Sequence, residues 1–246
     1  MAHRSQSGLS AAALIDIWEQ GAGRHPLDRA LLLLRYACPD EPFETLCEWT
    51  MGERDRRLLE SRRNTFGDRI DGYAECPACC NGLEFELSCE GISGSASTTG
   101  ATWHRVEQAR RSWNMRGPNS RDLAAAAAAP DLDRARRVIL SRCLRSGTDT
   151  VDESEWTDEL QAALAARLSE VDPLAEILID LRCAACGHAW QSVFDIAEFF
   201  WNEIYVRSRR VLQEIDLLAR TYGWTEGEIL GMTDQRRSLY VGMALS

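Results

Sequence analysis

The sequence predicts a mainly α-helical protein with a small β unit, an α+β fold in which two distant segments meet. Long stretches carry helical apolar periodicity and helix-capping residues. Two C-x-x-C turns, at Cys76 and Cys79 and again at Cys183 and Cys186, each follow and precede strand-like segments. The matched turns predict that the β unit is zinc-ribbon-like, with two knuckles that face each other although residues 80–182 separate them.

Residues 1–67 are expected to form an N-terminal helical region. Ser10 is placed to cap a first helix, and Pro26 stands in the first turn of a second. The segment 51–67 is a charged amphipathic helix that ends at Gly67. Its apolar stripe is thin, so we expect this helix at the surface with one face docked.

The β unit is expected to combine residues 68–90 with residues 176–196. After the first knuckle Leu83, Phe85 and Leu87 alternate with acidic and polar residues, so they point to one face of a strand. The second knuckle has the same strand, turn, strand order. This is the internal repeat that the sequence shows.

Residues 91–175 are expected to form a helical insertion between the two halves of the β unit. The segment 91–102 is rich in Gly, Ser and Thr and is predicted to be a loop. Residues 103–170 are predicted to be helical again, with one helix capped at Asn119 or Ser120.

Residues 197–246 are expected to form C-terminal helices. Apolar residues recur at helical spacing on one face of a long helix: Ile196, Phe200, Ile204, Val211, Ile215 and Leu218. Gly223 is predicted to end this helix, Thr225 and Glu228 have capping-box spacing, and a last helix is expected over 233–244.

Four thiolates within tetrahedral reach form the usual structural site for Zn²⁺, so Cys76, Cys79, Cys183 and Cys186 are the predicted ligands. Buried thiols or a redox pair are the alternative, which a single C-x-x-C would favour. Cys80 could compete as a ligand. His188 could replace a cysteine, although a hydrogen bond near the knuckle is the favoured role.

A closed four-cysteine site has no open coordination position for water, which argues against metallohydrolase chemistry. The chain also contains none of the phosphate-binding, dinucleotide-binding, nucleophile-elbow or zinc-protease motifs. We therefore expect a non-enzymatic protein without a small-molecule substrate.

Charge and composition narrow the class of partner. The net charge of −10 and the pI near 5.0 give no general attraction for nucleic acid or for an anionic membrane. No apolar run reaches the length of a membrane span, and no signal peptide is expected at the N-terminus. The odd count of 9 cysteines favours a reducing compartment over a disulfide framework.

Aromatic residues near the start of the long C-terminal helix exceed what one buried stripe needs. We expect some of them, Trp201 and Tyr205 among them, to contact another domain or another protein.

Three segments together resemble a known family. They are GERDRRLLESRRNTFGDRIDGYAECPAC, RGPNSRDLAAAA and the tail LARTYGWTEGEILGMTDQRRSLYVGM. In this order they resemble the T4-like phage baseplate hub assembly chaperone family, as found in gene clusters for contractile phage-tail-like injection systems. The resemblance covers most of residues 26–245.

The resemblance implies a non-enzymatic baseplate assembly factor that acts in the bacterial cytoplasm and binds baseplate or hub proteins. No catalytic residue is carried over. The matched positions are expected to be structural or partner-binding: the four cysteines, Arg121, Asp122, Tyr222, Gly223, Trp224, Glu228, Met232, Arg236, Arg237 and Tyr240. Of these, Tyr222, Trp224, Arg236, Arg237 and Tyr240 join Trp201 and Tyr205 as the predicted partner-binding residues.

Cys80 is a departure from the family pattern, because glycine is expected directly after the knuckle, where it eases a positive φ. The second knuckle keeps Gly187.

Two other functions stay open at this point. The chain could be a permanent structural subunit of the particle, present in the finished baseplate. It could also be a zinc-ribbon nucleic-acid-binding protein, which its acidic charge disfavours.

Overall fold

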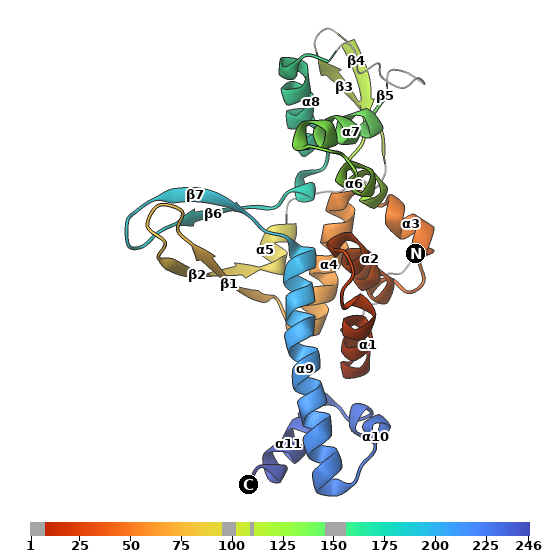
Figure 1. Ribbon diagram of the computed structural model, residues 1–246, viewed down its shortest axis with the longest axis vertical. Coiled ribbons are helices and arrows are strands. Elements are labelled where there is room, and N and C mark those ends of the chain that lie inside the picture. The colour runs from red at the N-terminus through yellow and green to blue at the C-terminus, as the bar shows by residue number, and fades with distance from the viewer. Residues whose placement is uncertain (1–7, 95–101, 109–110, 146–155) are drawn as a thin grey trace.

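The computed structural model describes residues 8–94, 102–108, 111–145 and 156–246. A long helix, α9 (Ile196–Tyr222), forms the axis of an elongated molecule (Figure 1). The N-terminal helices pack along α9, the insertion lies beyond one end of it, and two β-hairpins project sideways from the same region (Figure 1). No helix in the described ranges is long and apolar enough to cross a membrane.

The N-terminal region contains four helices: α1 (Ala11–Gly21), α2 (Pro26–Ala37), α3 (Phe43–Glu48) and α4 (Met51–Phe66). Ser10 caps α1 as predicted, because its side chain accepts a hydrogen bond from the amide of Ala13. Gly67 ends α4 with φ +95°. The short helix α3 was not predicted, because six residues carry too little periodicity.

The main core lies where α1, α2, α4 and α9 meet. Apolar side chains that are fully or almost fully buried fill it: Leu14, Ile17, Leu33, Leu34, Leu58, Leu59, Phe200 and Ile204. The predicted apolar face of α9 is therefore confirmed, since it packs into this core over its first half and against α1 further along.

The prediction that α4 lies at the surface is wrong. Charged side chains of this helix are buried along with its leucines: Glu53, Arg54, Asp55 and Arg62. They are satisfied by ion pairs and hydrogen bonds, of which Arg54 to Asp55 at 2.6 Å is one. Counting apolar positions underestimates the burial of such a helix, because paired charges also belong to the interior.

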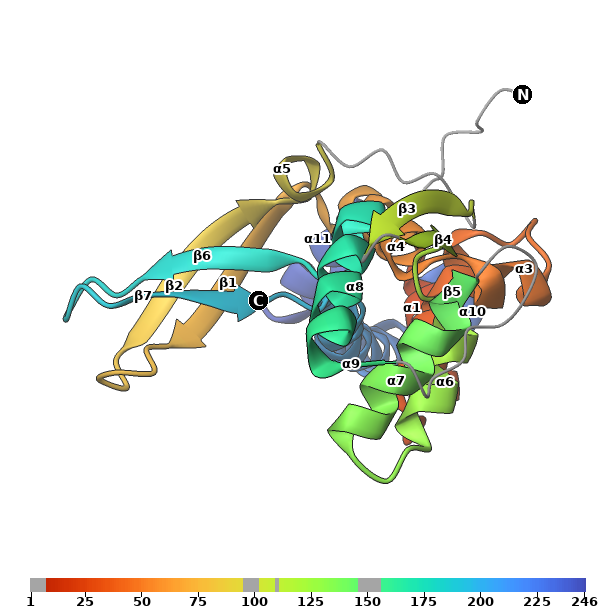
Figure 2. The ribbon, with the colours of Figure 1, turned by 90° about the horizontal axis from the view of Figure 1, so that it is seen from above.

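The two hairpins carry the β unit that the sequence predicted. The first joins β1 (Arg69–Glu75) to β2 (Gly82–Ser88), and the second joins β6 (Leu178–Arg182) to β7 (Ala189–Val193). Both are antiparallel and lie side by side, seen from above in Figure 2. Alternate residues of each strand are half-buried or buried, so the apolar faces of the hairpins are turned inward.

The insertion differs from the helical region expected over 103–170, because it contains a three-stranded sheet. The strands are β3 (His104–Gln108), β4 (Arg111–Met115) and β5 (Leu144–Arg145), in the order β3-β4-β5. The helices α6 (Ser120–Ala127), α7 (Leu132–Cys143) and α8 (Asp158–Val171) accompany it. Trp113, Met115 and Leu164 join strand to helix in a second core, which a local pattern could not reveal.

Two further segments refine the predicted ends of the insertion. The expected loop over 91–102 begins inside a short helix, α5 (Cys89–Ser93), and residues 95–101 lie outside the described part of the chain. At the other end a 3₁₀ turn, η2 (Pro173–Ala175), leads from α8 toward β6. Asn119 is the cap of α6, with a capping box to Asp122.

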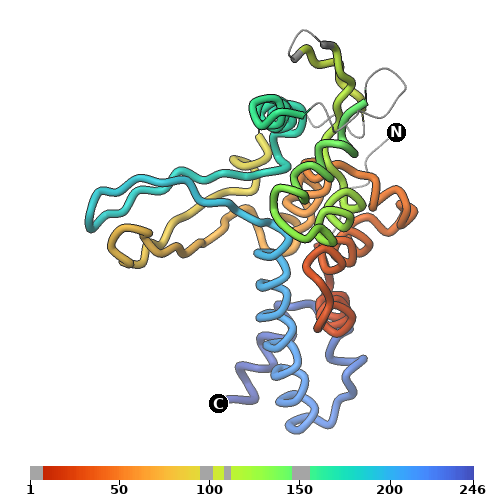
Figure 3. Tube along the Cα trace, turned by 45° about the horizontal axis from the view of Figure 1, so that its top comes forward, coloured from red at the N-terminus to blue at the C-terminus, as the bar shows by residue number. Residues whose placement is uncertain are grey.

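The chain ends in two helices that fold back on α9, as the tube in Figure 3 shows. Gly223 ends α9 in the left-handed conformation at φ +71°, as predicted. Thr225 and Glu228 form the predicted capping box of α10 (Glu226–Leu230). The last helix, α11 (Asp234–Ala244), begins at a Thr233 cap.

Arg62 joins three elements at the base of the first hairpin. Its guanidinium forms a two-pronged ion pair with Glu203 of α9 at 2.7 and 2.9 Å. It also donates to the carbonyls of Gly67 and Arg69 at 2.7 and 2.6 Å. The Arg62 side chain is 4% exposed, so these partners replace the water that it loses.

Replacing Arg62 with Leu is expected to lower the free energy of unfolding by about 3 kcal/mol, because Glu203 and two carbonyls lose a buried partner. The matched control is Arg63→Leu. Arg63 is adjacent, half exposed, and pairs with Asp68 and Glu90 at 3.4 and 3.3 Å. This control should cost under about 1 kcal/mol. Urea unfolding measures both, and equal losses would show that Arg62 has no special role.

Candidate metal centre

The four predicted cysteines come together at the tips of the two hairpins. Each C-x-x-C turn occupies the connection between two paired strands, so the hairpins hold their cysteines at their free ends. In the first turn the amide of Cys80 donates to the carbonyl of Cys76 at 2.8 Å. The amide of Cys76 donates to the carbonyl of Asn81 at 3.0 Å.

The second turn repeats this pattern. The amide of Gly187 donates to the carbonyl of Cys183 at 3.0 Å, and the amide of Cys183 donates to the carbonyl of His188 at 2.8 Å. The two knuckles therefore have the same backbone hydrogen-bond pattern, although their sequences have little in common beyond the cysteines. The repeat that the sequence indicated is a repeat of hydrogen-bonded turns.

The sulfur atoms lie at distances that suit a shared tetrahedral ion. Cys76 Sγ is 3.7 Å from Cys186 Sγ, and Cys79 Sγ is 3.6 Å from Cys183 Sγ. All four lie within 4.8 Å of one another. A disulfide would need about 2.05 Å. Four sulfurs placed about 2.3 Å from a central metal stand about 3.8 Å apart, which matches the shorter of these separations.

Backbone amides point at two of the sulfurs. The amide of Asn81 faces Cys79 and, with the neighbouring thiols, lowers the pKa of Cys79 to about 6. The amide of His188 favours the thiolate of Cys186 in the same way. Hydrogen bonds shared with Cys79 and the other two thiols outweigh it and raise the pKa of Cys186 to about 12.

This split follows from hydrogen bonds shared among the thiols, which favour the thiolate of Cys79 beside the protonated Cys186. Four thiolates so close together repel one another, so protons shared between sulfurs must offset the repulsion unless a cation does so. A divalent cation would displace those protons and be held by four negative ligands. The donor set therefore fits a metal ion on grounds of both distance and charge.

The other candidate ligands lie outside the cluster. Within the described residues the group contains the four cysteines alone, without Cys80 or His188. The Cys80 thiol is exposed. The imidazole of His188 stacks on Trp190 at a centroid distance of 6.0 Å. The backbone carbonyl of His188 accepts the hydrogen bond from the amide of Cys183 in the knuckle. The side chain of Asn81 donates to Cys79 Sγ at 3.4 Å, a contact to a ligand atom that sequence analysis missed.

The structure separates the predicted partner-binding residues into two groups. Trp201 and Tyr205 lie in the first third of α9, whereas Tyr222 ends it. Tyr205 and Tyr222 are 17 residues apart, about 25 Å along α9 at 1.5 Å per residue. The helix α11 folds back along this stretch, because Arg207 donates to Asp234 at 3.0 Å. Tyr205 is 40% exposed and accepts a hydrogen bond from Arg209 at 3.2 Å.

Two members of the predicted set are buried, which corrects their assignment as surface contacts. Trp201 is 6% exposed and lies under Arg29, whose guanidinium is 4.6 Å from the ring centroid. Arg237 is 1% exposed and donates to Glu214 of α9 at 2.8 Å. Both hold the fold together, because each joins α9 to a neighbouring element.

The remaining members gather at the far end of α9. Tyr222 and Trp224 stack with ring centroids 4.5 Å apart, and Tyr240 meets Trp224 edge-on at 4.8 Å. Arg236 is exposed and lies 5.7 Å from the Tyr240 ring. Aromatic packing of this kind ties α10 and α11 to the end of α9.

Comparison with known proteins adds no relative, because no protein family model, curated protein or solved structure matches this chain.

Cys80 stands in the left-handed region at φ +57°, in the position that Gly187 occupies at φ +74° in the second knuckle. A side chain there is strained by about 1 kcal/mol. Changing Cys80 to Gly should therefore stabilise the metal-loaded chain by about 1 kcal/mol, and Gly187→Ala should destabilise it similarly.

Thermal unfolding and elemental analysis measure this pair of variants. Nothing lies within 4 Å of a Cβ added at Gly187, so the destabilisation expected for Gly187→Ala would come from the positive φ and not from a steric clash. Loss of metal from the Cys80→Gly variant would contradict the assignment and make Cys80 a ligand.

Proposed function

We propose that the chain binds one structural Zn²⁺ through Cys76, Cys79, Cys183 and Cys186, and that it acts by binding proteins, without catalysis. The observation that supports the zinc site most directly is the close approach of sulfurs from two hairpins, at 3.6 and 3.7 Å. Zinc is the ion that most commonly occupies four-cysteine sites built from paired knuckles.

The proposed zinc is structural because four protein ligands complete its coordination. It has no position for a water or a substrate, so it supplies neither a hydroxide nor a Lewis-acid centre. Its effect is mechanical. Two-stranded hairpins are marginal alone, and a shared ion at their tips prevents them from separating.

The proposed role is that of an assembly factor for the baseplate of a contractile phage-tail-like particle, acting on baseplate or hub subunits in the bacterial cytoplasm. The support is the order of the sequence segments that resemble the T4-like hub assembly chaperone family. Several of the matched residues maintain local structure: Asp122 and Glu228 complete capping boxes, Gly223 ends α9, and Arg237 is paired with Glu214.

The electrostatics of the hairpins disfavour the alternative of a nucleic-acid-binding zinc ribbon. Four exposed carboxylates occupy the exposed face of the first hairpin: Asp71, Glu75, Glu84 and Glu86. One exposed arginine, Arg69, pairs with Asp71 and Glu86, so the face keeps a net negative charge. A phosphate backbone would be repelled by this face. The remaining alternative is that the chain is a permanent subunit of the finished particle. Testing purified particles for the chain distinguishes this alternative from a transient assembly factor.

Changing Cys183 to Ser should release the metal and unfold the chain, since metal binding and folding free energy are coupled in such sites. Cys80→Ser is the matched control and should keep one zinc per chain and an unchanged melting temperature. Elemental analysis, native mass and circular dichroism measure the outcome. A Cys183→Ser chain without metal but with unchanged melting would overturn the structural role.

Co-expression with the hub and baseplate subunits of a contractile tail-like particle tests the proposed partner class. The expected result is a soluble complex with a hub subunit, together with absence of the chain from purified finished particles. Stoichiometric amounts in the particle would make the chain a permanent subunit. Failure to bind any hub or baseplate subunit would reject the baseplate role.

A further inference from the structure

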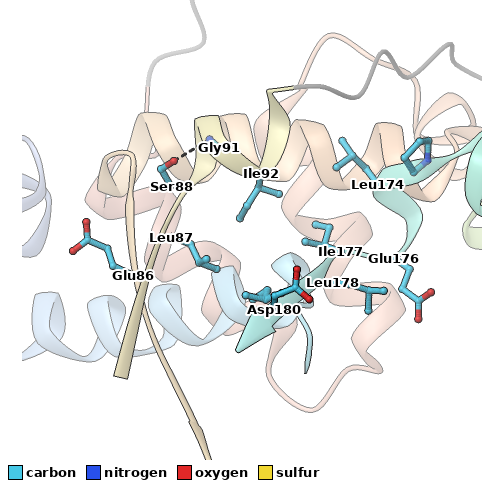
Figure 4. Close-up of a pocket in the computed structure, with 12 residues that line it drawn as sticks. Glu86, Leu87, Ser88, Gly91, Ile92, Leu174, Glu176, Ile177, Leu178 and Asp180 are labelled. Atoms are coloured by element: carbon cyan, nitrogen blue, oxygen red, sulfur yellow. Dashed lines mark hydrogen bonds between the residues drawn. The ribbon is translucent and has the colours of Figure 1, made fainter. Parts of the chain in front are cut away.

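A cleft of about 550 Å³ opens between the two hairpins near their bases. Its walls come from the end of β2, from α5, from η2 and from the start of β6 (Figure 4). In this view Leu87, Ile92, Leu174 and Ile177 lie around the same space, and Glu86 and Glu176 stand at opposite ends of it. The volume falls in the range of binding sites on proteins.

The cleft exposes the edges of two strands. Three consecutive residues of β2, 86–88, and three consecutive residues of β6, 178–180, line it. Side chains of a strand alternate between faces, so a strand that presented one face would contribute every second residue. Consecutive lining residues are what we expect where a strand meets a cleft with its backbone edge.

These edges have no second neighbour in the part of the chain that the structure describes. β2 pairs with β1 and β6 pairs with β7, each in a two-stranded sheet. An unpaired edge presents backbone amides and carbonyls to any extended chain of the right length. A third strand would also stabilise hairpins that are marginal by themselves.

The side chains around the cleft define the chemistry of its occupant. Half of the twelve lining residues are leucine or isoleucine, and Leu178 is 48% exposed. The charged members are Glu86, Glu176 and Asp180, and none of the twelve is basic. Glu86 is paired with Arg69 of β1 at 3.1 Å, so the negative charge offered to a partner comes from Glu176 and Asp180. The cleft therefore has an apolar centre, with acidic side chains toward its ends.

We propose that this cleft binds an extended segment of a partner protein in which apolar and basic residues alternate, as an added strand on β2 or β6. The apolar side chains would enter the cleft, and the basic side chains would meet Glu176 and Asp180. The proposal deepens the proposed function, on which it rests, by naming the kind of segment through which a partner is held.

A synthetic peptide of alternating lysine and valine, about nine residues long, is the probe, because β2 contains 7 residues. Isothermal titration against the zinc-loaded chain should show binding that weakens as salt is raised. An alternating lysine and proline peptide should bind at least about tenfold more weakly, because proline cannot donate to a strand edge. An alternating glutamate and valine peptide should not bind.

The variant Glu176→Lys with Asp180→Lys should weaken lysine–valine binding at least about tenfold. Its matched control, Glu19→Lys with Glu41→Lys, makes the same change in net charge at exposed positions outside both the cleft and the hairpins and should bind normally. Circular dichroism and zinc content check that both variants are folded.

Three results would overturn the proposal: no binding of the lysine–valine peptide, equal binding of the proline peptide, or equal loss in the two double variants. Co-expression with a hub subunit distinguishes failure of this proposal from failure of the proposed function. If that complex forms and survives Glu176→Lys with Asp180→Lys, the cleft is wrong and the function stands. If the peptide binds the cleft but no hub complex forms, the function is wrong and the cleft stands.

Discussion

The ion pair between the buried Arg62 and Glu203 fixes the point from which the rest of the molecule extends. It joins α4 to α9, and the same guanidinium holds the carbonyls that begin β1. The first hairpin therefore leaves α4 where the second hairpin enters α9, by way of Phe194 and Asp195. Because the bases of the β1–β2 and β6–β7 hairpins are held close together, the cysteines at their tips can meet at the far end of the hairpins.

The insertion depends on a second junction, at Asp172. Its carboxylate accepts from the amide of Gly52 at 3.0 Å and lies against both Gly52 and Gly117. A Cβ at either glycine would stand within 2.5 Å of this carboxylate, so only glycine permits the approach. The amide of Met51 donates to the carbonyl of Pro118 at 2.7 Å beside it. The insertion is thus attached at its two ends and leaves the hairpins undisturbed.

Charge is distributed differently in the interior and on the hairpins. Arginines at the helix interfaces are paired and buried, as with Arg62 and Arg237. The hairpins instead display unburied carboxylates beside an apolar cleft. Paired interior charges favour one arrangement of helices. Exposed like charges next to apolar surface favour a basic and apolar partner, because that partner relieves both repulsion and hydration cost.

The sequence by itself determined the features that depend on near neighbours. These are the caps at Ser10 and Thr225, the end of α9 at Gly223, and the two knuckles with their four cysteines. Capping, turns and alternation are local, so spacing alone indicates them. The tertiary structure alone decided that Trp201 and Arg237 are interior, that α4 is central, that β3, β4 and β5 form a sheet, and that strand edges border a cleft. Each of those depends on residues far away in the chain, whose contacts no local pattern records.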